Sequence, residues 1–302
     1  MSAGRVLDHL RRLSGSAVLA GQHNRQPLGT PSLWFDRAAR MTGRVPAVWG
    51  QDFEFEAVEI EARPSMIDEA IRQWEAGRLV TLSWHACPPT RGEPCDWAAD
   101  VQGRLTDDEW VALTTPGTAL QQRWSEQVES VAVYLQQLQD AGVEVLWRPL
   151  HEINEQAFWW GNRPGPSGSA LLYRQLHEQM LDLGLSSLIW VWCVDDWVDD
   201  DEIAAYWPGD FVDVVGLDVY RRRFPTRRTY EALTALAGRR PMALTEVASV
   251  PTPEELSSQP RWSYWVTWAE MLEDPEINDP RLVTRTFTHP RTVTAGPFPG
   301  RA

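Results

Sequence analysis

VEVLWRPLHE, residues 143–152, is the stretch that decides the fold. Its first half is an apolar run that predicts a buried strand, and it ends in an arginine, a histidine and a glutamate. Apolar residues at helical spacing precede it at 120–142, and a second helix is predicted at 169–183. A short apolar strand between two helices is typical of a parallel sheet that is covered on both faces.

The same alternation repeats along the chain. Seven further apolar runs predict strands, at 17–23, 46–53, 79–85, 187–196, 212–220, 241–249 and 263–270. Helical segments lie between them, and eight such units predict an α/β protein, a single-domain (β/α)₈ TIM barrel. A chain of 302 residues is long enough for one large core. We therefore expect the barrel to span 1–295 and a disordered C-terminal tail to follow at 296–302.

Charge and hydropathy exclude several classes of partner. The formal net charge is −14, and basic residues are dense only around 221–228, so a nucleic acid partner is not expected. Charged residues interrupt every apolar run in 1–22, which therefore predicts neither a signal peptide nor a membrane span. We expect a monomer, without a membrane partner, that is cytoplasmic unless the sequence is a trimmed piece of a secreted protein.

Cysteines and short motifs give no sign of a metal or a cofactor. Cys87, Cys95 and Cys193 are too few and too unevenly spaced for a disulfide framework, and we interpret them as inert thiols. HEINE lacks the second histidine of HExxH, and the acidic run at 195–202 lacks the glycine and the final glutamate of a calcium loop. Neither a P-loop nor GxGxxG occurs. We predict that the protein uses no metal and no cofactor.

Tryptophan is unusually frequent. Seventeen tryptophans accompany only six tyrosines and eight phenylalanines. Flat indole faces pack well on apolar surfaces, including the C–H faces of pyranose rings. We interpret most of these residues as core and a few, at strand ends, as platforms for a sugar.

The predicted barrel makes the strand ends candidates for a functional site, because catalytic groups on this fold lie at the carboxyl ends of its strands. Polar and aromatic side chains gather at those positions: Gln22, His23, Gln51, Asp52, Trp84, His85, Arg148, His151, Glu152, Asp195, Asp196, Asp218, Tyr220, Glu246, Trp265 and Trp268.

Two of these residues form a candidate catalytic pair. Glu152 ends the fourth predicted strand and Glu246 lies at the end of the seventh, nearly across the barrel. Two carboxyl groups about 5–5.5 Å apart are the arrangement of a retaining glycosidase. The acid of such a pair needs a raised pKa, which burial against the aromatics at 158–160 could supply. Arg148 and Tyr220 could keep Glu246 ionised.

WRPLHEINEQAFWWG, residues 147–161, resembles the acid/base signature RPxHExNGxWFWWG of glycoside hydrolase family 26, the family of β-mannanases and related β-glycanases. SWHACPP, YWPGDFVDVVGLDVY and LTEVAS resemble three more motifs of that family in the right order, so the resemblance covers roughly 15–295. It implies that Glu152 is the acid/base, that Glu246 is the nucleophile, and that the substrate is a β-1,4-mannan or a mannooligosaccharide. The substrate-binding residues expected are His85, Trp97, Arg148, His151, Asn154, Trp159, Asp218, Tyr220 and Trp268.

The chain departs from this pattern at two positions. Glu155 stands where the family has glycine, and Ala157 stands where it has tryptophan. The missing indole weakens the expectation of mannan specificity but leaves the chemistry. Glu155 creates a second Asn-Glu pair, yet we prefer Glu152 as the acid because it follows His151, and we expect Glu155 on the loop surface.

Alternatives remain for the function. A related β-glycanase would act on mixed-linkage β-1,3-1,4-glucan or β-1,3-xylan, whereas a non-catalytic carbohydrate-binding barrel would not need a matched pair of glutamates. The connection at 86–120 is longer than usual, and such connections are mostly functional or disordered. Together with Ala157 it predicts a groove that is shortened or reshaped and that prefers short β-linked oligosaccharides.

Overall fold

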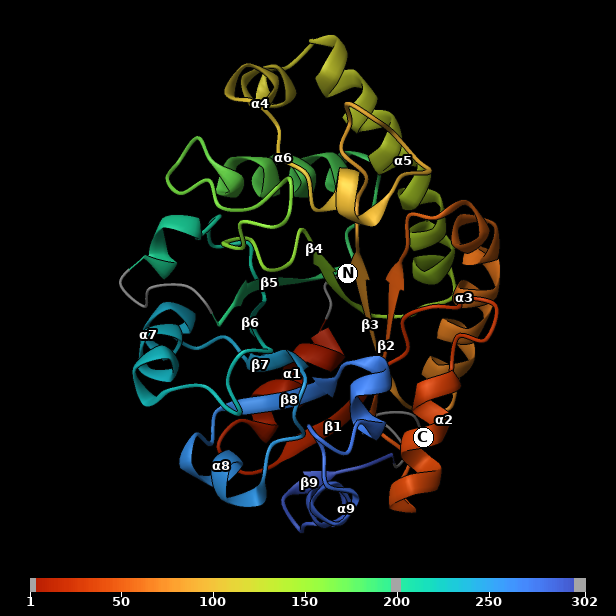
Figure 1. Cartoon of the computed structure of the whole chain (residues 1–302), viewed down its shortest axis with the longest axis vertical. Coiled ribbons are helices and arrows are strands. Elements are labelled where there is room, and N and C mark those ends of the chain that lie inside the picture. Colours follow the sequence, from red (N-terminus) through yellow and green to blue (C-terminus); the bar gives the residue numbers. More distant parts are fainter. Residues whose placement is uncertain (1–3, 197–201, 296–302) are drawn as a thin grey trace.

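A computed structural model describes residues 4–196 and 202–295. Eight parallel strands form a closed barrel, in which each strand pairs with the next and the eighth pairs with the first (Figure 1). The strands are β1 (Val18–His23), β2 (Val48–Phe53), β3 (Leu79–Trp84), β4 (Val145–Pro149), β5 (Ile189–Asp195), β6 (Val214–Val219), β7 (Met242–Val247) and β8 (Trp262–Thr267). The predicted (β/α)₈ barrel is confirmed.

Helices surround the barrel (Figure 1). They are α1 (Gly4–Leu13), α2 (Leu33–Thr42), α3 (Ala57–Glu75), α4 (Asp107–Thr114), α5 (Ala119–Asp140), α6 (Ser169–Asp182), α7 (Arg227–Ala237), α8 (Pro253–Ser258) and α9 (Pro280–Phe287). Three short helical turns are η1 (Trp97–Val101), η2 (Ile203–Tyr206) and η3 (Ala269–Glu273). A two-residue strand, β9 (Thr292–Val293), also pairs with β1. None of the helices in the described ranges is long and apolar enough to cross a membrane.

Every residue of the eight barrel strands is buried, which explains why the strands are apolar along their length. Most tryptophans are core residues, as expected, and the indoles of Trp49, Trp147 and Trp192 are fully buried. Gly21 in β1 lies so close to β8 that a Cβ atom would be 2.6 Å from the carbonyl oxygen of Trp265. The barrel therefore closes with no room for a side chain at that position.

The long connection between β3 and β4 is ordered. It contains η1 and α4 before α5 begins, and α4 packs against α5 and α6 at the outer edge of the molecule (Figure 1). It is thus a folded extension of the barrel rather than a mobile loop. The tail predicted at 296–302 lies outside the described residues.

Candidate active site

Glu152 and Glu246 face the same cavity at the carboxyl ends of the strands. Glu152 follows β4 and Glu246 belongs to β7, and both line a cavity of about 490 Å³. One carboxyl oxygen of each residue, together with one of Asp218 at the end of β6, lies within 4.8 Å of the others. The structure therefore brings the two glutamates close enough for a retaining pair, whose carboxyl groups lie about 5–5.5 Å apart.

Glu246 is held by two donors. The guanidinium of Arg148 donates to one carboxylate oxygen of Glu246, and the hydroxyl of Tyr220 donates to the other. Arg148 comes from β4 and Tyr220 directly follows β6, so two strands fix the orientation of a side chain on β7. Both contacts favour the ionised carboxylate.

A chain of hydrogen bonds fixes Arg148 in turn. Its second terminal nitrogen donates to Asp218 at 2.7 Å, and the hydroxyl of Thr245 donates to the other oxygen of Asp218 at 2.6 Å. Beneath them, the thiol of Cys193 lies 3.2 Å from the Thr245 hydroxyl. Asp218 and Glu246 thus share one buried cation, the guanidinium of Arg148.

The backbone at Glu152 adopts an uncommon conformation. Leu150 and Glu152 have positive φ angles of 47° and 49°, which non-glycine residues rarely adopt. The turn is held by hydrogen bonds from the amide of Ile153 to the carbonyl of Cys193, at 3.2 Å, and from the amide of Glu155 to the carbonyl of Glu152, at 2.7 Å. Backbone strain of this kind is common at catalytic sites, and here it directs the Glu152 side chain into the cavity.

The surroundings of the two glutamates differ in charge. Burial raises the pKa of Glu152 well above the usual range of a glutamic acid, and the negative charges of Asp218 and Glu246 raise it further. Burial also raises the pKa of Glu246, but Arg148 and the Tyr220 hydroxyl oppose this by stabilising its anion. Among the described residues, no side chain or backbone group forms a hydrogen bond with the Glu152 carboxyl group. We therefore place the proton of the pair on Glu152 and the negative charge on Glu246.

This distribution predicts the pH dependence of turnover. Because the pKa of Glu152 is raised, its protonated form persists as the pH rises through the normal range of a carboxyl group. For an oligosaccharide, kcat/KM is expected to remain high to neutral pH and to fall at higher pH as that proton is lost. On an aryl glycoside with a good leaving group, Glu152→Gln should lack this alkaline limb. If the fall in kcat/KM at high pH is unchanged in Glu152→Gln, that fall must come from the titration of another group.

Aromatic rings form one wall of the cavity. His85 packs edge-on against His151, with ring centroids 4.6 Å apart, and against Trp97 at 5.2 Å. Trp268 stacks on His23 at 4.3 Å. His85, Trp97, His151 and Trp268 all line the cavity together with Tyr220, so five of the predicted substrate-binding residues are brought together.

His85 is oriented by a buried carboxylate. Its Nδ1 atom lies 2.5 Å from Asp52 at the end of β2, and Asp52 is fully buried. The nearby charge of His85 lowers the pKa of Asp52 against the effect of burial. His151, in contrast, has its pKa lowered well below the usual histidine value by burial and by Arg148, so it is neutral. The two histidines of the wall therefore differ in their electrostatic surroundings.

Four of the predicted substrate-binding residues lie behind the cavity wall. Arg148 and Asp218 support Glu246, as described above, and do not line the cavity. Asn154 is buried and forms two hydrogen bonds with Asp195. The side-chain amide of Asn154 donates to the Asp195 carboxylate at 2.5 Å, and the backbone amide of Asp195 donates to the side-chain oxygen of Asn154 at 2.8 Å. Trp159 is also buried. Its indole nitrogen donates to the carbonyl of Ala86 at 2.8 Å, and its ring packs against Trp124 of α5. In this structure these four residues support the residues that line the cavity, and their contact with substrate stays a prediction.

The expectation for Glu155 was wrong. Its side chain lines the cavity beside Ala157 and pairs with Arg221 at 3.1 Å, and its other oxygen accepts a hydrogen bond from the Ala157 amide at 3.1 Å. Gly161 makes this possible, since a Cβ atom there would lie 2.1 Å from the carbonyl oxygen of Glu155. The loop folds back on itself and turns Glu155 inward.

Several cavity-lining residues were not singled out from the sequence. They are Arg25, Gln26, Glu54, Phe55, Glu56, Gln102 and Arg221. Most of them lie one to three residues beyond a strand end, so extending the candidate positions beyond the last strand residue would have found them. The acidic run at 195–202 lies partly outside the described residues.

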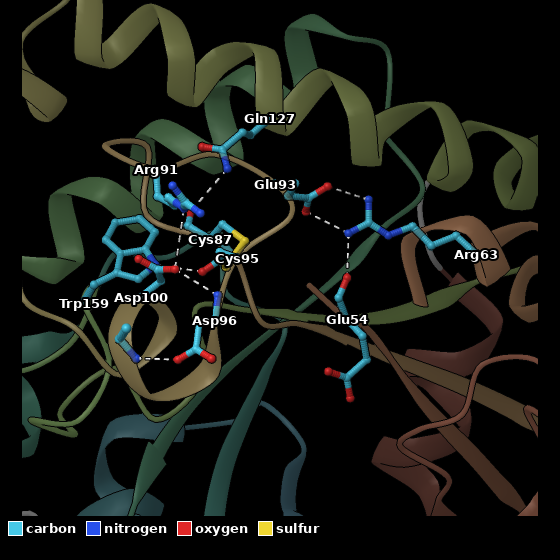
Figure 2. Close-up of a disulfide and its surroundings, with 12 residues drawn as sticks. Glu54, Arg63, Cys87, Arg91, Glu93, Cys95, Asp96, Asp100, Gln127 and Trp159 are labelled. Carbon is cyan, nitrogen blue, oxygen red and sulfur yellow. Dashed lines mark hydrogen bonds and ion pairs between the residues drawn. A yellow bond between two sulfur atoms is a disulfide. The ribbon is translucent and has the colours of Figure 1, made fainter. Parts of the chain in front are cut away.

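The interpretation of all three cysteines as unpaired thiols was also wrong. Cys87 and Cys95 form a disulfide across the loop that follows β3, with their Cα atoms 5.9 Å apart (Figure 2). Cys193 is a free, buried thiol. Two cysteines eight residues apart can pair only if the loop between them turns back, and the sequence gives no direct signal of that turn.

The comparisons with known proteins agree with this geometry. The model of glycosyl hydrolase family 26 matches residues 1–297. The chain belongs to glycosyl hydrolase family 26. A family 26 structure, GH26A from Muricauda sp. MAR_2010_75, is 37% identical, has a TM-score of 0.90, and the match covers 96% of this chain and 94% of that one.

Curated relatives of this chain carry the name mannan endo-1,4-beta-mannosidase. The one from Thermothelomyces thermophilus is 30% identical over 99% of this chain and 62% of its own length. The one from Bacillus subtilis strain 168 is 31% identical over 80% of this chain and 68% of its own length. Two from Piromyces sp. are covered over 49% and 52% of their length, so this chain spans about half to three fifths of the first relatives it matches.

Proposed function

We propose that this chain is a retaining glycoside hydrolase that cleaves β-1,4-mannan or mannooligosaccharides. The observation that carries the proposal is the pair Glu152 and Glu246, whose carboxyl oxygens lie within 4.8 Å in unequal surroundings. Such spacing leaves no room for the water molecule that the general base of an inverting enzyme holds between its carboxylate and the anomeric carbon. The names of the curated relatives support mannan as the substrate class.

The proposed reaction has two steps. Glu152 transfers its proton to the glycosidic oxygen while a Glu246 oxygen attacks the anomeric carbon, so that the leaving group departs as an alcohol and a glycosyl ester forms. Glu152, now ionised, then takes a proton from water, and the resulting hydroxide oxygen displaces Glu246. The anomeric configuration of the product is therefore that of the substrate. A non-catalytic sugar-binding barrel has no need of this pair.

Ala157, Glu155 and Arg221 suggest how the cavity differs from that of a typical family member. Ala157 leaves open a position where the family motif has an indole, and the ion pair of Glu155 and Arg221 lines the adjoining wall. Polar side chains that are able to hydrogen-bond to sugar hydroxyls thus line the cavity next to the position where the family motif has an apolar stacking surface. With the folded β3–β4 connection beside it, this supports a shortened groove and a preference for short β-linked oligosaccharides.

Product analysis tests the proposal. On a panel of soluble mannan, mannooligosaccharides, mixed-linkage β-1,3-1,4-glucan and β-1,3-xylan, we expect turnover of the β-1,4-mannosides, with short chains hydrolysed fastest. Chromatography at early times should show few product lengths. Turnover of only the mixed-linkage glucan or only the xylan would show that mannan is not the substrate. Rapid loss of mannan viscosity with a broad ladder of products would instead show an open, endo-acting groove.

We also propose that the enzyme works outside the reducing cytoplasm. The disulfide between Cys87 and Cys95 supports this, because such bonds persist mainly in oxidising compartments. Thiol alkylation of the native protein from its source, with and without prior reduction, would test it. If both cysteines are alkylated without prior reduction, the disulfide is absent from the native protein, and a location in the cytoplasm would be favoured instead.

A further inference from the structure

Trp97 is an exposed aromatic side chain in the cavity. Its exposed fraction is 37%, the largest among the tryptophans that line the cavity, and its ring stacks on Phe55 with centroids 5.8 Å apart and 25° between the planes. It also packs against His85 and Phe158. An exposed indole beside three other rings is suited to stack on a substrate sugar.

The segment that carries Trp97 has little regular structure of its own. Trp97 is the first residue of η1, a turn of five residues, which is capped by the side chain of Asp96 accepting from the amide of Ala99 at 2.8 Å. So short a helix does not hold its position without contacts to the rest of the fold. The ring must therefore be positioned by what precedes and follows η1.

The disulfide provides one such connection. Cys95 lies two residues before Trp97, and its partner Cys87 lies two residues after His85, so the bond ties the start of η1 to the end of β3 (Figure 2). The Cys95 amide also donates to the carbonyl of Phe55 at 3.2 Å, and the side chain of Gln127 on α5 donates to the carbonyl of Cys87 at 3.3 Å.

A buried ion pair provides the second connection. Arg63 on α3 donates to both carboxylate oxygens of Glu93, at 2.7 and 2.8 Å; Glu93 lies in the disulfide loop, residues 87–95. Arg63 also donates to the backbone carbonyl oxygen of Glu54 at 2.7 Å (Figure 2). Arg63 is only 2% exposed, so this bidentate pair is well shielded from water. It links the disulfide loop to the segment after β2 that carries Phe55.

We propose that the Cys87–Cys95 disulfide, acting with the Arg63–Glu93 pair, is a positioning element that holds Trp97 against Phe55 as a sugar-stacking surface. The disulfide does not touch the reacting atoms. Its loss should therefore weaken substrate binding through Trp97 and leave the chemistry of Glu152 and Glu246 in place. This inference rests on the proposed function, since it assigns the stacked ring to the substrate.

A double-mutant cycle tests the proposal. Cys87→Ala/Cys95→Ala is expected to raise KM for a mannooligosaccharide roughly five-fold and to change kcat less than about two-fold, the size of effect typical of one stacking contact. Trp97→Ala should raise KM by a similar factor. Adding the cysteine substitutions to Trp97→Ala should then change KM little, because the ring that the disulfide positions is already gone. Thr90→Ala, an exposed position in the same loop, is the matched control and should change neither constant.

Hydrogen–deuterium exchange provides a readout that needs no substrate. In the double cysteine variant, exchange should rise in the peptide at 95–102 and stay unchanged in the barrel strands, whereas Thr90→Ala should resemble the wild type. Additive effects on KM in the cycle, or unchanged exchange at 95–102, would overturn the positioning role. A wild-type protein that is inactive on every glycan would overturn the proposed function instead, because the exchange result does not depend on turnover.

Discussion

Replacing Glu246 with alanine should lower kcat by on the order of 10⁴-fold on every substrate, whatever its leaving group. Both steps of a double displacement pass through this carboxylate. Sodium azide should partly restore turnover by attacking the anomeric carbon from the vacated position. The product should then be a glycosyl azide of inverted configuration, which nuclear magnetic resonance can identify.

Glu246→Gln is the matched variant, because it keeps the shape of the side chain and its amide oxygen can still accept a hydrogen bond from one of the two donors, Arg148 or Tyr220. It should be as inactive as the alanine variant while retaining a melting temperature closer to that of the wild type. The stereochemistry of the wild-type reaction is an independent check. A first-formed product of inverted configuration would contradict the role of Glu246 directly.

Replacing Glu152 with alanine should produce a loss that depends on the leaving group. For an oligosaccharide, kcat/KM should fall by roughly 10²- to 10⁴-fold, the usual contribution of a general acid. For an aryl glycoside whose leaving group needs no proton, formation of the glycosyl ester should be largely spared. The slow step then becomes hydrolysis of that ester, and a burst of phenol should precede steady-state turnover.

Azide should rescue this variant too, but with the opposite stereochemical result. It attacks the glycosyl ester from the face that water would use, so the glycosyl azide should have the configuration of the substrate. Glu155→Ala is an informative comparison, because Glu155 lies in the same loop and also faces the cavity. If Glu155→Ala showed the dependence on leaving group and Glu152→Ala did not, the acid would have been assigned to the wrong glutamate.

The architecture was predictable from the sequence because it depends on local patterns. Eight apolar runs alternate with helical segments, and the barrel is the fold in which such strands are covered on both sides. The positions of Glu152 and Glu246 followed from the same argument, since both residues stand at strand ends. Strand ends meet at one edge of the barrel whatever the connections between them contain.

The inward turn of Glu155 and the disulfide were not predictable in this way. Glu155 turns inward because Gly161 allows the loop to fold back and because Arg221, more than sixty residues away, pairs with it. The pairing of Cys87 with Cys95 likewise depends on the path of the loop between them. Such features depend on contacts between loops of different strands, which carry no periodic signal.

The bond from Arg148 to Glu246 has a consequence for the second half of the reaction. In the free enzyme, Arg148 carries one positive charge against the two negative charges of Glu246 and Asp218. When Glu246 becomes an ester it loses its charge, and Arg148 and Asp218 are left as a neutral pair. One of the negative charges that raised the pKa of Glu152 has then disappeared, so that this pKa must fall. Glu152, which has given up its proton, is thereby stabilised as an anion while the glycosyl ester exists. It takes a proton from the attacking water in the step that releases Glu246 as a carboxylate.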